Sequence, residues 1–460
     1  LRDEDGRPAY MVSIMQDITE RQLLHAELRH QARHDPLTGL PNRRYVFERM
    51  AELFATDSPQ QRIGLCYVDL DGFKVVNDAL GHYVGDRLLV AVADRLHQCV
   101  KRFGHLVGRM GGDEFLIVVA RSTGLEETVG IADAVLDVLE PPVQIDGHEL
   151  SISASVGVVE RPTEGTTIAD LVKAADTTLS WAKSAGKRRR SVFDAERHDR
   201  ELARYRLATT MPAALERGEF TVEYQPLVRL ADEAICGVEA LVRWQHPELG
   251  LLMPSTFIYL AEETGLIVPL GLWVLEESCR QARSWRAGPG GLLLSVNMAV
   301  RQIQDSTVVD AARRILSETG LDPGLLQLEL TESALMTGAG EPLENIHALS
   351  SLGVRIAIDD FGTGYSNLAY LCTLPVHTLK LAQSFVDGLG GADGPDPTKD
   401  RLVGSLIRLA HGLGLSTTAE GVENEAQAGR LRELECDTAQ GWLFGRPESA
   451  DRIADLVSTV

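Results

Sequence analysis

Short apolar runs, each followed by a longer stretch with helical spacing of its apolar residues, recur along most of the chain. In residues 35–190, four segments have the apolar or alternating character of strands: 63–68, 106–107, 115–119 and 150–159. From residue 211 to residue 460, strand-like segments begin near Val222, Gly237, Leu292, Leu326, Val354, Thr378, Ser416 and Asp437. Eight strand–helix units in this length predict a TIM-like (β/α)₈ barrel, so we expect an α/β multidomain protein.

Two helical segments without a strand pattern border these regions. Residues 20–34 contain no Gly or Pro and predict a linker helix that carries Leu24 and Leu28 on one face. This face suits a two-stranded signalling coil, and it equally suits a helix packed on its own domain. Residues 191–210 are charged and helix-prone, and they predict a second linker helix.

The first residues combine a turn signal at Asp3–Gly6 with an apolar stretch at 10–15 and a polar exit segment, Asp17–Arg21. Residues 1–19 in this way resemble the C-terminal end of a PAS sensor domain, which implies an upstream sensor. Because the chain starts at Leu1, we expect it to be cut from a longer protein. We expect that protein to be cytoplasmic, with a membrane tether in a preceding segment as the alternative.

Composition and charge exclude several classes of protein. The chain has 460 residues, of which 44% are hydrophobic and 24% charged, as in globular proteins with more than one domain. A net charge of −21 argues against binding nucleic acid or an anionic membrane. No apolar run approaches the roughly 20 residues that span a bilayer, so we expect no membrane contact in this segment. Six cysteines without a Cys-x-x-Cys pair indicate free thiols in a reducing compartment.

Three polar segments accompany the predicted strands of residues 35–190. In Val68–Lys74, an aspartate ends a strand, where its carboxylate and a neighbouring carbonyl can bind a hard cation, and a lysine can meet phosphate. Asn77–Asp86 offers Asn, His and Asp side chains that can read the edge of a guanine. In Arg109–Phe115, two glycines make a tight hairpin turn, and two acidic residues follow where Mg²⁺–nucleotide chemistry needs them.

These segments and Asp35–Arg43 together closely resemble the diguanylate cyclase (GGDEF) domain over residues 35–190. The resemblance implies a nucleotide-cyclase-palm-like α+β fold and a homodimer that condenses two GTP molecules into cyclic di-GMP. It implies that Mg²⁺ is bound by Asp69, the carbonyl of Leu70, Asp113 and Glu114. The implied catalytic residues are Lys74, Asp113 and Glu114. Glu114 would also help to deprotonate the 3′-hydroxyl. The implied GTP-binding residues are Asn77, His82 and Asp86 for guanine and ribose, Lys74 and Lys183 for the triphosphate, and Arg109.

Polar residues stand at or near the ends of almost all predicted strands of residues 211–460: Glu239, Asn297, Glu329, Asp359, Asp360, Lys380, Glu420 and Gln440. In a (β/α)₈ barrel these strand ends meet at one mouth. A single buried carboxylate can be a satisfied structural group, but several at one mouth repel one another unless cations lie between them. The pattern therefore predicts a two-metal hydrolytic centre.

Five segments of this region closely resemble EAL phosphodiesterases: Tyr224–Val228, Glu239–Trp244, Asp359–Ser366, Ala419–Glu423 and Gln440–Phe444. Over residues 211–460 the resemblance implies hydrolysis of cyclic di-GMP to linear pGpG by two Mg²⁺ or Mn²⁺ ions. Lys380 would orient or activate water beside the catalytic Glu239 and Glu420, and Glu332 would anchor residues 360–366. The implied metal ligands are Glu239, Asn297, Glu329, Asp359, Asp360 and Glu420, and the implied substrate contacts are Gln225, Arg243 and Gln440.

Three positions depart from these families. His105 replaces the acid of an Arg-x-x-Asp product-inhibition site, and imidazole cannot act as a carboxylate acceptor, so we expect weak or absent feedback inhibition. Ala382 replaces an acid after Lys380, and Ala299 replaces a hydroxyl after Asn297, so we expect metal binding with reduced turnover.

The leading interpretation is a bifunctional enzyme that binds GTP and cyclic di-GMP and dimerises through the linker helix and both domains. The upstream sensor would determine whether synthesis or hydrolysis of cyclic di-GMP dominates. In the alternative, only one domain is catalytic and the other is a GTP- or cyclic di-GMP-binding regulatory module. A structural scaffold would not explain two complete sets of polar residues.

Overall fold

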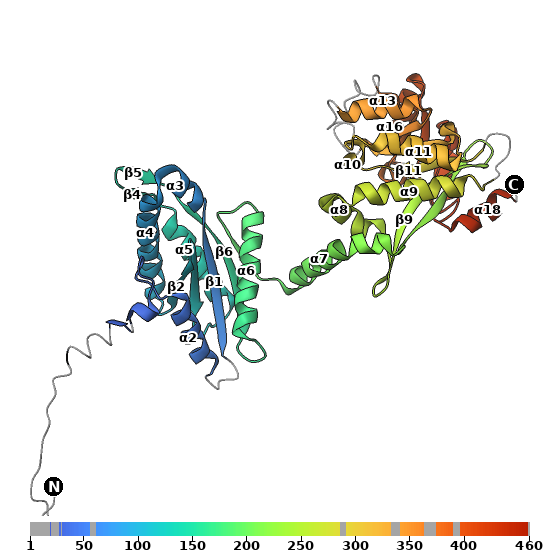
Figure 1. Ribbon diagram of the computed structural model, residues 1–460. Coiled ribbons are helices and arrows are strands. Elements are labelled where there is room, and N and C mark those ends of the chain that lie inside the picture. The colour runs from blue at the N-terminus through green and yellow to red at the C-terminus, as the bar shows by residue number, and fades with distance from the viewer. Residues whose placement is uncertain are drawn as a thin grey trace, which may run out of the picture. The chain divides into compact units, whose positions relative to one another are not determined.

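The computed structural model describes residues 30–55, 61–285, 291–332, 341–362, 374–389 and 396–458, together with Thr19, Glu27 and Leu28. It divides into two compact units, Leu1–Asp199 and Arg200–Val460 (Figure 1). The PAS-like segment before Thr19 and Leu24 of the first predicted helix lie outside the described residues. Leu28 is described and is 61% exposed. Among helices in the described ranges, none is both long enough and apolar enough to cross a bilayer.

The first unit is built on a five-stranded sheet in the order β2-β3-β1-β6-β7. Its central strand β1 is antiparallel to both neighbours, and β7 is parallel to β6. A separate hairpin, β4–β5, stands beside it. The strands are β1 (Arg62–Asp71), β2 (Leu106–Gly111), β3 (Glu114–Val119), β4 (Val143–Ile145), β5 (His148–Leu150), β6 (Ser153–Pro162) and β7 (Arg190–Val192).

Helices cover both faces of this sheet because the central strands are apolar on both faces. In β3, Phe115 and Ile117 belong to one buried cluster, and Leu116 and Val118 to another, as the two-residue repeat of a strand requires. The first cluster includes apolar residues of α4 and α5, and the second includes those of α2 and α6. The helices are α2 (Arg43–Phe54), α3 (Phe73–Leu80), α4 (His82–Lys101), α5 (Leu125–Leu139) and α6 (Ile168–Ser184).

The second unit is an eight-stranded closed barrel, as the strand pattern predicted. The chain of pairings runs β9-β11-β12-β13-β14-β15-β16-β8 and closes because β8 also pairs with β9. A short strand, β10 (Gly250–Leu252), extends the β9 side. The barrel strands are β8 (Phe220–Arg229), β9 (Ile235–His246), β11 (Leu293–Asn297), β12 (Leu326–Thr331), β13 (Arg355–Phe361), β14 (Thr378–Leu381), β15 (Ser416–Ala419) and β16 (Thr438–Ala439).

One strand of the barrel departs from the simple strand–helix repeat. β8 is antiparallel to both β9 and β16, whereas the pairs from β9 round to β16 are parallel. Residues 230–234 join β8 to β9, and a connection this short allows only an antiparallel hairpin. The N-terminal half of β8 therefore reaches the mouth that the other strands approach with their C-terminal ends.

Helices surround the barrel, and one of them connects the barrel to the first unit. This helix, α7 (Ala195–Glu216), begins later than residue 191 because β7 pairs with β6, and its residues Leu207, Met211 and Ala214 are buried in the barrel core. The others are α8 (Pro254–Thr264), α9 (Ile267–Ala282), α10 (Val300–Ile303), α11 (Val308–Thr319), η1 (Pro323–Leu325), α13 (Glu341–Ser351), α15 (Gln383–Val386), α16 (Pro397–Gly412), α17 (Glu425–Glu433) and α18 (Ala450–Ser458).

Candidate functional site

Lys380 lies at the centre of the acidic groups of the barrel mouth. Its Nζ is 2.5 Å from Glu420 Oε1, 2.6 Å from Glu329 Oε2, 3.3 Å from Asp359 Oδ1 and 3.6 Å from Glu239 Oε2. Lys380 is 1% exposed, and Glu239 and Glu329 are also buried. One ammonium cannot balance four carboxylates, so most of the negative charge at the mouth remains uncompensated.

Burial, reinforced by neighbouring carboxylates, raises the pKa of several acidic groups at this mouth. Burial raises the pKa of Glu329 to about 8, an effect that Lys380 opposes and that Glu239 and Asp359 reinforce. Burial likewise raises the pKa of Glu420 to about 7 against the influence of Lys380, and it raises the pKa of Asp360 together with its neighbour Asp359. A divalent cation bound between the carboxylates would favour their charged forms.

Asp359, Asp360 and Glu420 come close enough together to bind one cation, because one oxygen of each lies within 4.8 Å of the others. Two neighbours in a regular strand would point to opposite faces. Here the pairing of β13 with β14 shifts between Ile358 and Phe361, and Asp360 has a φ of 53°. The bulge and the left-handed residue break the alternation, so both aspartates reach the same cluster as Glu420.

Two amide side chains donate to Glu239, and a third amide, Gln225, contacts one of them. Asn297 Nδ2 donates to Glu239 Oε1 at 2.5 Å, and Gln440 Nε2 donates to Glu239 Oε2 at 2.8 Å. Gln440 Nε2 also donates to Gln225 Oε1 at 2.9 Å, and Gln225 Nε2 donates to the carbonyl of Gly445 at 3.0 Å. Gln225 reaches this position because antiparallel β8 pairs it directly with Glu239. These contacts fix the orientation of the Glu239 carboxylate.

Five of the predicted metal ligands line one polar cavity of about 440 Å³, together with Gln225 and Gln440. These five are Glu239, Asn297, Asp359, Asp360 and Glu420. Arg243, in contrast, is buried and committed to other partners, since its Nε donates to Glu223 Oε2 at 2.8 Å and its Nη1 to the carbonyl of Val242 at 3.0 Å.

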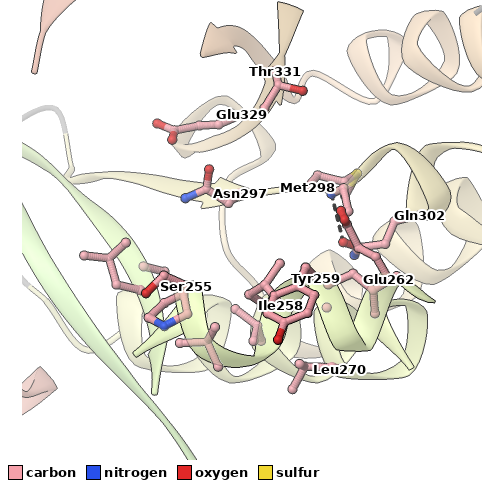
Figure 2. A pocket seen from close by; sticks show the side chains of 18 residues that line it. Ser255, Ile258, Tyr259, Glu262, Leu270, Asn297, Met298, Gln302, Glu329 and Thr331 are labelled. Carbon is pink, nitrogen blue, oxygen red and sulfur yellow. Dashed lines mark hydrogen bonds between the residues drawn. The ribbon is translucent and has the colours of Figure 1, made fainter. Parts of the chain in front are cut away.

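A second cavity, of about 470 Å³ and largely apolar, adjoins the same centre. Figure 2 shows Asn297 and Glu329 on one side of it and Ile258, Tyr259 and Leu270 on the other. The apolar wall comes from α8 and α9, whose residues look like ordinary core positions in the sequence. Sequence reasoning missed this cavity, because helical spacing alone cannot distinguish a packed face from one that lines a hollow.

Glu332 and Ala382 directly follow β12 and β14, the strands that carry Glu329 and Lys380. Glu332 Oε2 accepts a hydrogen bond from the backbone of Gly362 at 3.1 Å, which ties the end of β12 to the segment after Asp360. Residues 363–366 of the segment that it was predicted to anchor lie outside the described residues. Ala382 is buried at the N-terminal cap of α15 and adds no carboxylate next to Lys380.

In the first unit, Asp69, Asp113 and Glu114 meet where β1 ends and β3 begins. Asp69 pairs in register with Glu114, and the backbone N–H of Leu70 donates to the carbonyl of Asp113 at 3.3 Å. Lys183 Nζ lies 2.7 Å from Asp69 Oδ2. Burial raises the pKa of Asp69, an effect that Lys183 opposes and that Asp113 and Glu114 reinforce. Like the barrel mouth, this site concentrates carboxylates that a cation would balance.

Arg109 holds the turn between β2 and β3. Its Nε and Nη2 donate to the carbonyl of Gly112 at 3.0 and 2.8 Å, and its Nη1 donates to Asp35 Oδ1 at 2.9 Å. Gly111 and Gly112 have φ values of 146° and 52°, which explains why this turn needs glycine. The guanidinium therefore bonds to groups of the protein itself, whereas the sequence analysis predicted a contact with GTP.

The predicted guanine-binding residues lie on two consecutive helices. Asn77 is in the last turn of α3, His82 is the first residue of α4, and Asp86 follows one turn later. A Cβ on Gly85 would lie 1.9 Å from Asn77 Oδ1, so only glycine leaves room for this side chain. Lys74, at the start of α3, is exposed.

Two residues with supporting contacts escaped the sequence analysis. Tyr67 donates from its hydroxyl to Glu114 Oε2 at 3.1 Å. Asp71 accepts from Ser153 Oγ at 3.0 Å, Ser155 Oγ at 2.8 Å and the backbone N–H of Arg188 at 3.1 Å. No local pattern joins residues so far apart in the chain.

His105 is nearly enclosed. Its Nε2 lies 3.6 Å from Glu127 Oε1, and its side chain is 7% exposed. Burial lowers the pKa of His105 although Glu127 acts in the opposite direction.

Comparisons with known proteins match both units. The model of the "Diguanylate cyclase, GGDEF domain" matches residues 32–189, and that of the "EAL domain" matches residues 208–447. The bifunctional diguanylate cyclase/cyclic di-GMP phosphodiesterase MucR of Pseudomonas aeruginosa is 39% identical over 94% of this chain and 62% of its own length. The cyclic di-GMP phosphodiesterase PdeR of Escherichia coli is 37% identical over 94% of this chain and 64% of its own length.

A solved structure agrees with the second unit. The PaMucR phosphodiesterase in complex with c-di-GMP is 42% identical, covers 54% of this chain and 99% of its own, and has a TM-score of 0.51. The chain spans about half to two thirds of the length of the curated relatives it matches.

Proposed function

This chain belongs to the proteins that join a GGDEF domain to an EAL domain, and we propose that it both makes and hydrolyses cyclic di-GMP. The GGDEF domain would condense two GTP molecules, and the EAL barrel would open the product to pGpG. The observation that carries the proposal is the barrel mouth, where four carboxylates share one buried lysine.

The residues of the barrel mouth fit a two-cation hydrolytic site. Asp359, Asp360 and Glu420 can share one ion, since their oxygens already converge. Glu239 and Asn297 line the same cavity and Glu329 lies beside Lys380, so these three would complete the ligand set. Mg²⁺ or Mn²⁺ held there would lower the pKa of a bound water. Lys380 would keep Glu329 and Glu420 oriented, and Asn297 and Gln440 would do so for Glu239.

The shape of the mouth suits a cyclic dinucleotide. Such a substrate has a phosphodiester between two nucleosides, so it needs a metal-binding centre with room for a base on either side. The polar and apolar cavities both border on Asn297, and together they provide that room. The apolar cavity in Figure 2 is large enough for a purine base.

The GGDEF site suits phosphoryl transfer between two nucleotides. Asp69, Asp113, Glu114 and the carbonyl of Leu70 would hold Mg²⁺, and Lys183 would turn from Asp69 to the triphosphate. Asn77, His82 and Asp86 would bind guanine and ribose. Because each domain would present one GTP, synthesis requires two chains.

Chromatography of nucleotides tests the proposal. The protein is incubated with GTP and Mg²⁺, and separately with cyclic di-GMP and Mg²⁺ or Mn²⁺. We expect Glu114→Ala to abolish synthesis alone and Glu239→Ala to abolish hydrolysis alone. Survival of both activities in both variants would show that the assigned sites are wrong.

A second candidate function is a chain with one catalytic domain and one binding module. The absence of a carboxylate at Ala382 favours it for the barrel. In the same assay, such a chain would accumulate cyclic di-GMP from GTP and release no pGpG.

A further inference from the structure

Trp442 is an unusual residue for the rim of a carboxylate-lined cavity. It lines the same cavity as Glu239 and Asp359, yet its side chain is 62% exposed. The guanidinium carbon of Arg446 lies 4.9 Å from the centroid of the indole ring. A large aromatic side chain is normally buried, because water contact with its faces is unfavourable. Because this indole lines the cavity that holds the carboxylates, it can stack on a planar group of a ligand bound there.

The backbone holds Trp442 firmly at the rim. The N–H of Val422 donates to the carbonyl of Gln440 at 3.0 Å, and the N–H of Leu443 donates to the carbonyl of Val422 at 3.1 Å. A Cβ on Gly441 would lie 2.1 Å from the carbonyl oxygen of Val422, so the two segments are in direct contact. The indole follows immediately after this contact and is therefore preorganised.

We propose that Trp442 is a stacking surface for one purine base of cyclic di-GMP, a substrate-binding role that rests on the proposed hydrolytic function. Every base has a π-face, and an exposed aromatic ring binds it by stacking. Arg446 braces the indole by a cation–π contact. Its positive charge also offsets the acidic mouth for a ligand that carries phosphates. The other base would enter the apolar cavity, which the polar cavity meets at Asn297.

A buried acceptor near Trp442 indicates that the ligand there is a nucleobase rather than a purely apolar group. Gln440 is 5% exposed and lines the same cavity. Its Nε2 donates to Gln225 and Glu239, whereas its Oε1 has no hydrogen-bond partner among the described residues. A buried acceptor without a donor is unfavourable, and the N–H groups of guanine are suitable donors.

Three variants and two substrates test the role of Trp442. The variants are Trp442→Ala, Trp442→Phe and, as a matched control, Tyr205→Ala, which removes an aromatic ring that is 69% exposed on α7. The kcat and KM are measured for cyclic di-GMP and for bis(p-nitrophenyl) phosphate, a phosphodiester without bases, in Mn²⁺. Binding of cyclic di-GMP is measured by calorimetry in Ca²⁺.

We expect Trp442→Ala to raise the Kd and KM for cyclic di-GMP about tenfold, as loss of one base stack would. The kcat for cyclic di-GMP and the hydrolysis of bis(p-nitrophenyl) phosphate should change less than about twofold, because the metal centre is intact. Trp442→Phe should retain most of the affinity, and Tyr205→Ala should behave like the unaltered protein.

Two results would overturn the inference and leave the proposed function standing. One is an unaltered Kd and KM in Trp442→Ala, and the other is an equal loss on both substrates, which would indicate a structural role. If the unaltered protein binds cyclic di-GMP without hydrolysing it, the Kd values alone test the role of Trp442, and an unaltered Kd in Trp442→Ala overturns it. If it neither binds nor hydrolyses cyclic di-GMP, the proposed function fails and the inference fails with it.

Discussion

At the scale of single residues, buried Lys380 and half-buried Arg109 show how one cation organises a site. Lys380 is in contact with four carboxylates that come from four different strands or strand ends. Arg109 joins Asp35 to the glycine turn between β2 and β3. In both cases the charge fixes the positions of neighbouring groups.

Replacing Lys380 by Met should destabilise the barrel strongly. The four carboxylates would lose their only described cationic partner, and breaking a buried pair of this kind costs about 3–5 kcal/mol. We expect urea unfolding in EDTA to show that the free energy of unfolding falls by about 3 kcal/mol. Saturating Mg²⁺ should restore part of this free energy. Lys399→Met is the control, because Lys399 is only half-buried and its Nζ donates to the backbone carbonyl of Ser384 at 3.2 Å. Equal stability of the two variants would contradict this account.

Replacing Arg109 by Ala should impair synthesis through the turn rather than through GTP binding. Because its guanidinium bonds to Gly112 and Asp35, we expect kcat to fall about tenfold or more while KM for GTP rises less than about threefold. Steady-state kinetics with GTP and Mg²⁺ measure both constants. A rise in KM with an unchanged kcat would show that Arg109 binds substrate, as its position in the sequence suggested.

At the scale of elements, close packing and a few polar contacts determine how neighbouring strands and helices fit. β15 and β16 are only four and two residues long, and Asp437 before β16 joins them. It accepts from the backbone and hydroxyl of Thr417 at 2.8 Å each, and from His411 Nε2 at 2.9 Å. In the first unit, α6 approaches β6 so closely that Gly157 has no room for a side chain.

The contribution of Asp437 to stability should depend on pH. Burial raises its pKa, but the hydrogen bonds from His411 and Thr417 lower it more, so the pKa lies below its ordinary value. A lowered pKa stabilises the fold above the ordinary value of about 3.9, and this contribution is lost as pH falls through the folded-state pKa. We expect Asp437→Asn to cost about 1–2 kcal/mol at neutral pH. Urea titrations should show the difference shrinking in acid, and a constant difference would contradict the assignment.

Gly157→Ala should destabilise the first unit. The added Cβ would lie 2.2 Å from the carbonyl oxygen of Ala175 and 2.3 Å from the backbone nitrogen of Leu179, so α6 would have to move. Overpacking of this kind costs about 1–3 kcal/mol. Gly130→Ala is a matched control, because a Cβ there in α5 would meet nothing within 4 Å. Thermal unfolding should separate the two variants, and similar midpoints would argue against the close approach.

At the scale of the whole molecule, the two units have separate cores and separate sites. This separation is consistent with one chain that performs two opposite reactions. Under the proposed function, hydrolysis would need one barrel mouth, whereas condensation of two GTP molecules would need two GGDEF domains.

Mixing of chains should reveal the proposed pairing of cyclase domains. An excess of Glu114→Ala chains should reduce the synthesis by unaltered chains several-fold, because mixed dimers would contain only one competent domain. An excess of Glu239→Ala chains is the comparison, because these chains keep an intact GGDEF domain and should add to the synthesis rather than reduce it. Chromatography of the products measures the rate after each mixture is assembled. If Glu114→Ala has no effect in excess, synthesis does not proceed through exchangeable dimers.

The sequence by itself determined the elements and much of the chemistry of this protein. The barrel strands begin close to the predicted positions, because apolar periodicity is a local property of the chain. Carboxylates at strand ends indicated a cation-binding mouth, since parallel strands bring those ends together. The antiparallel β8 was not predicted, although the short connection between β8 and β9 accounts for it.

Only the tertiary structure decided how these groups meet. The bulge in β13 brings Asp359 and Asp360 to one cluster, and Trp442 lines the same cavity as these aspartates. Nothing in the sequence indicated that Arg109 bonds to Gly112 or that an apolar cavity lies beside Asn297. The physical reason is the same in each case: these arrangements depend on contacts between residues far apart in the chain or on local departures from a regular strand. Neither leaves a periodic pattern in the sequence.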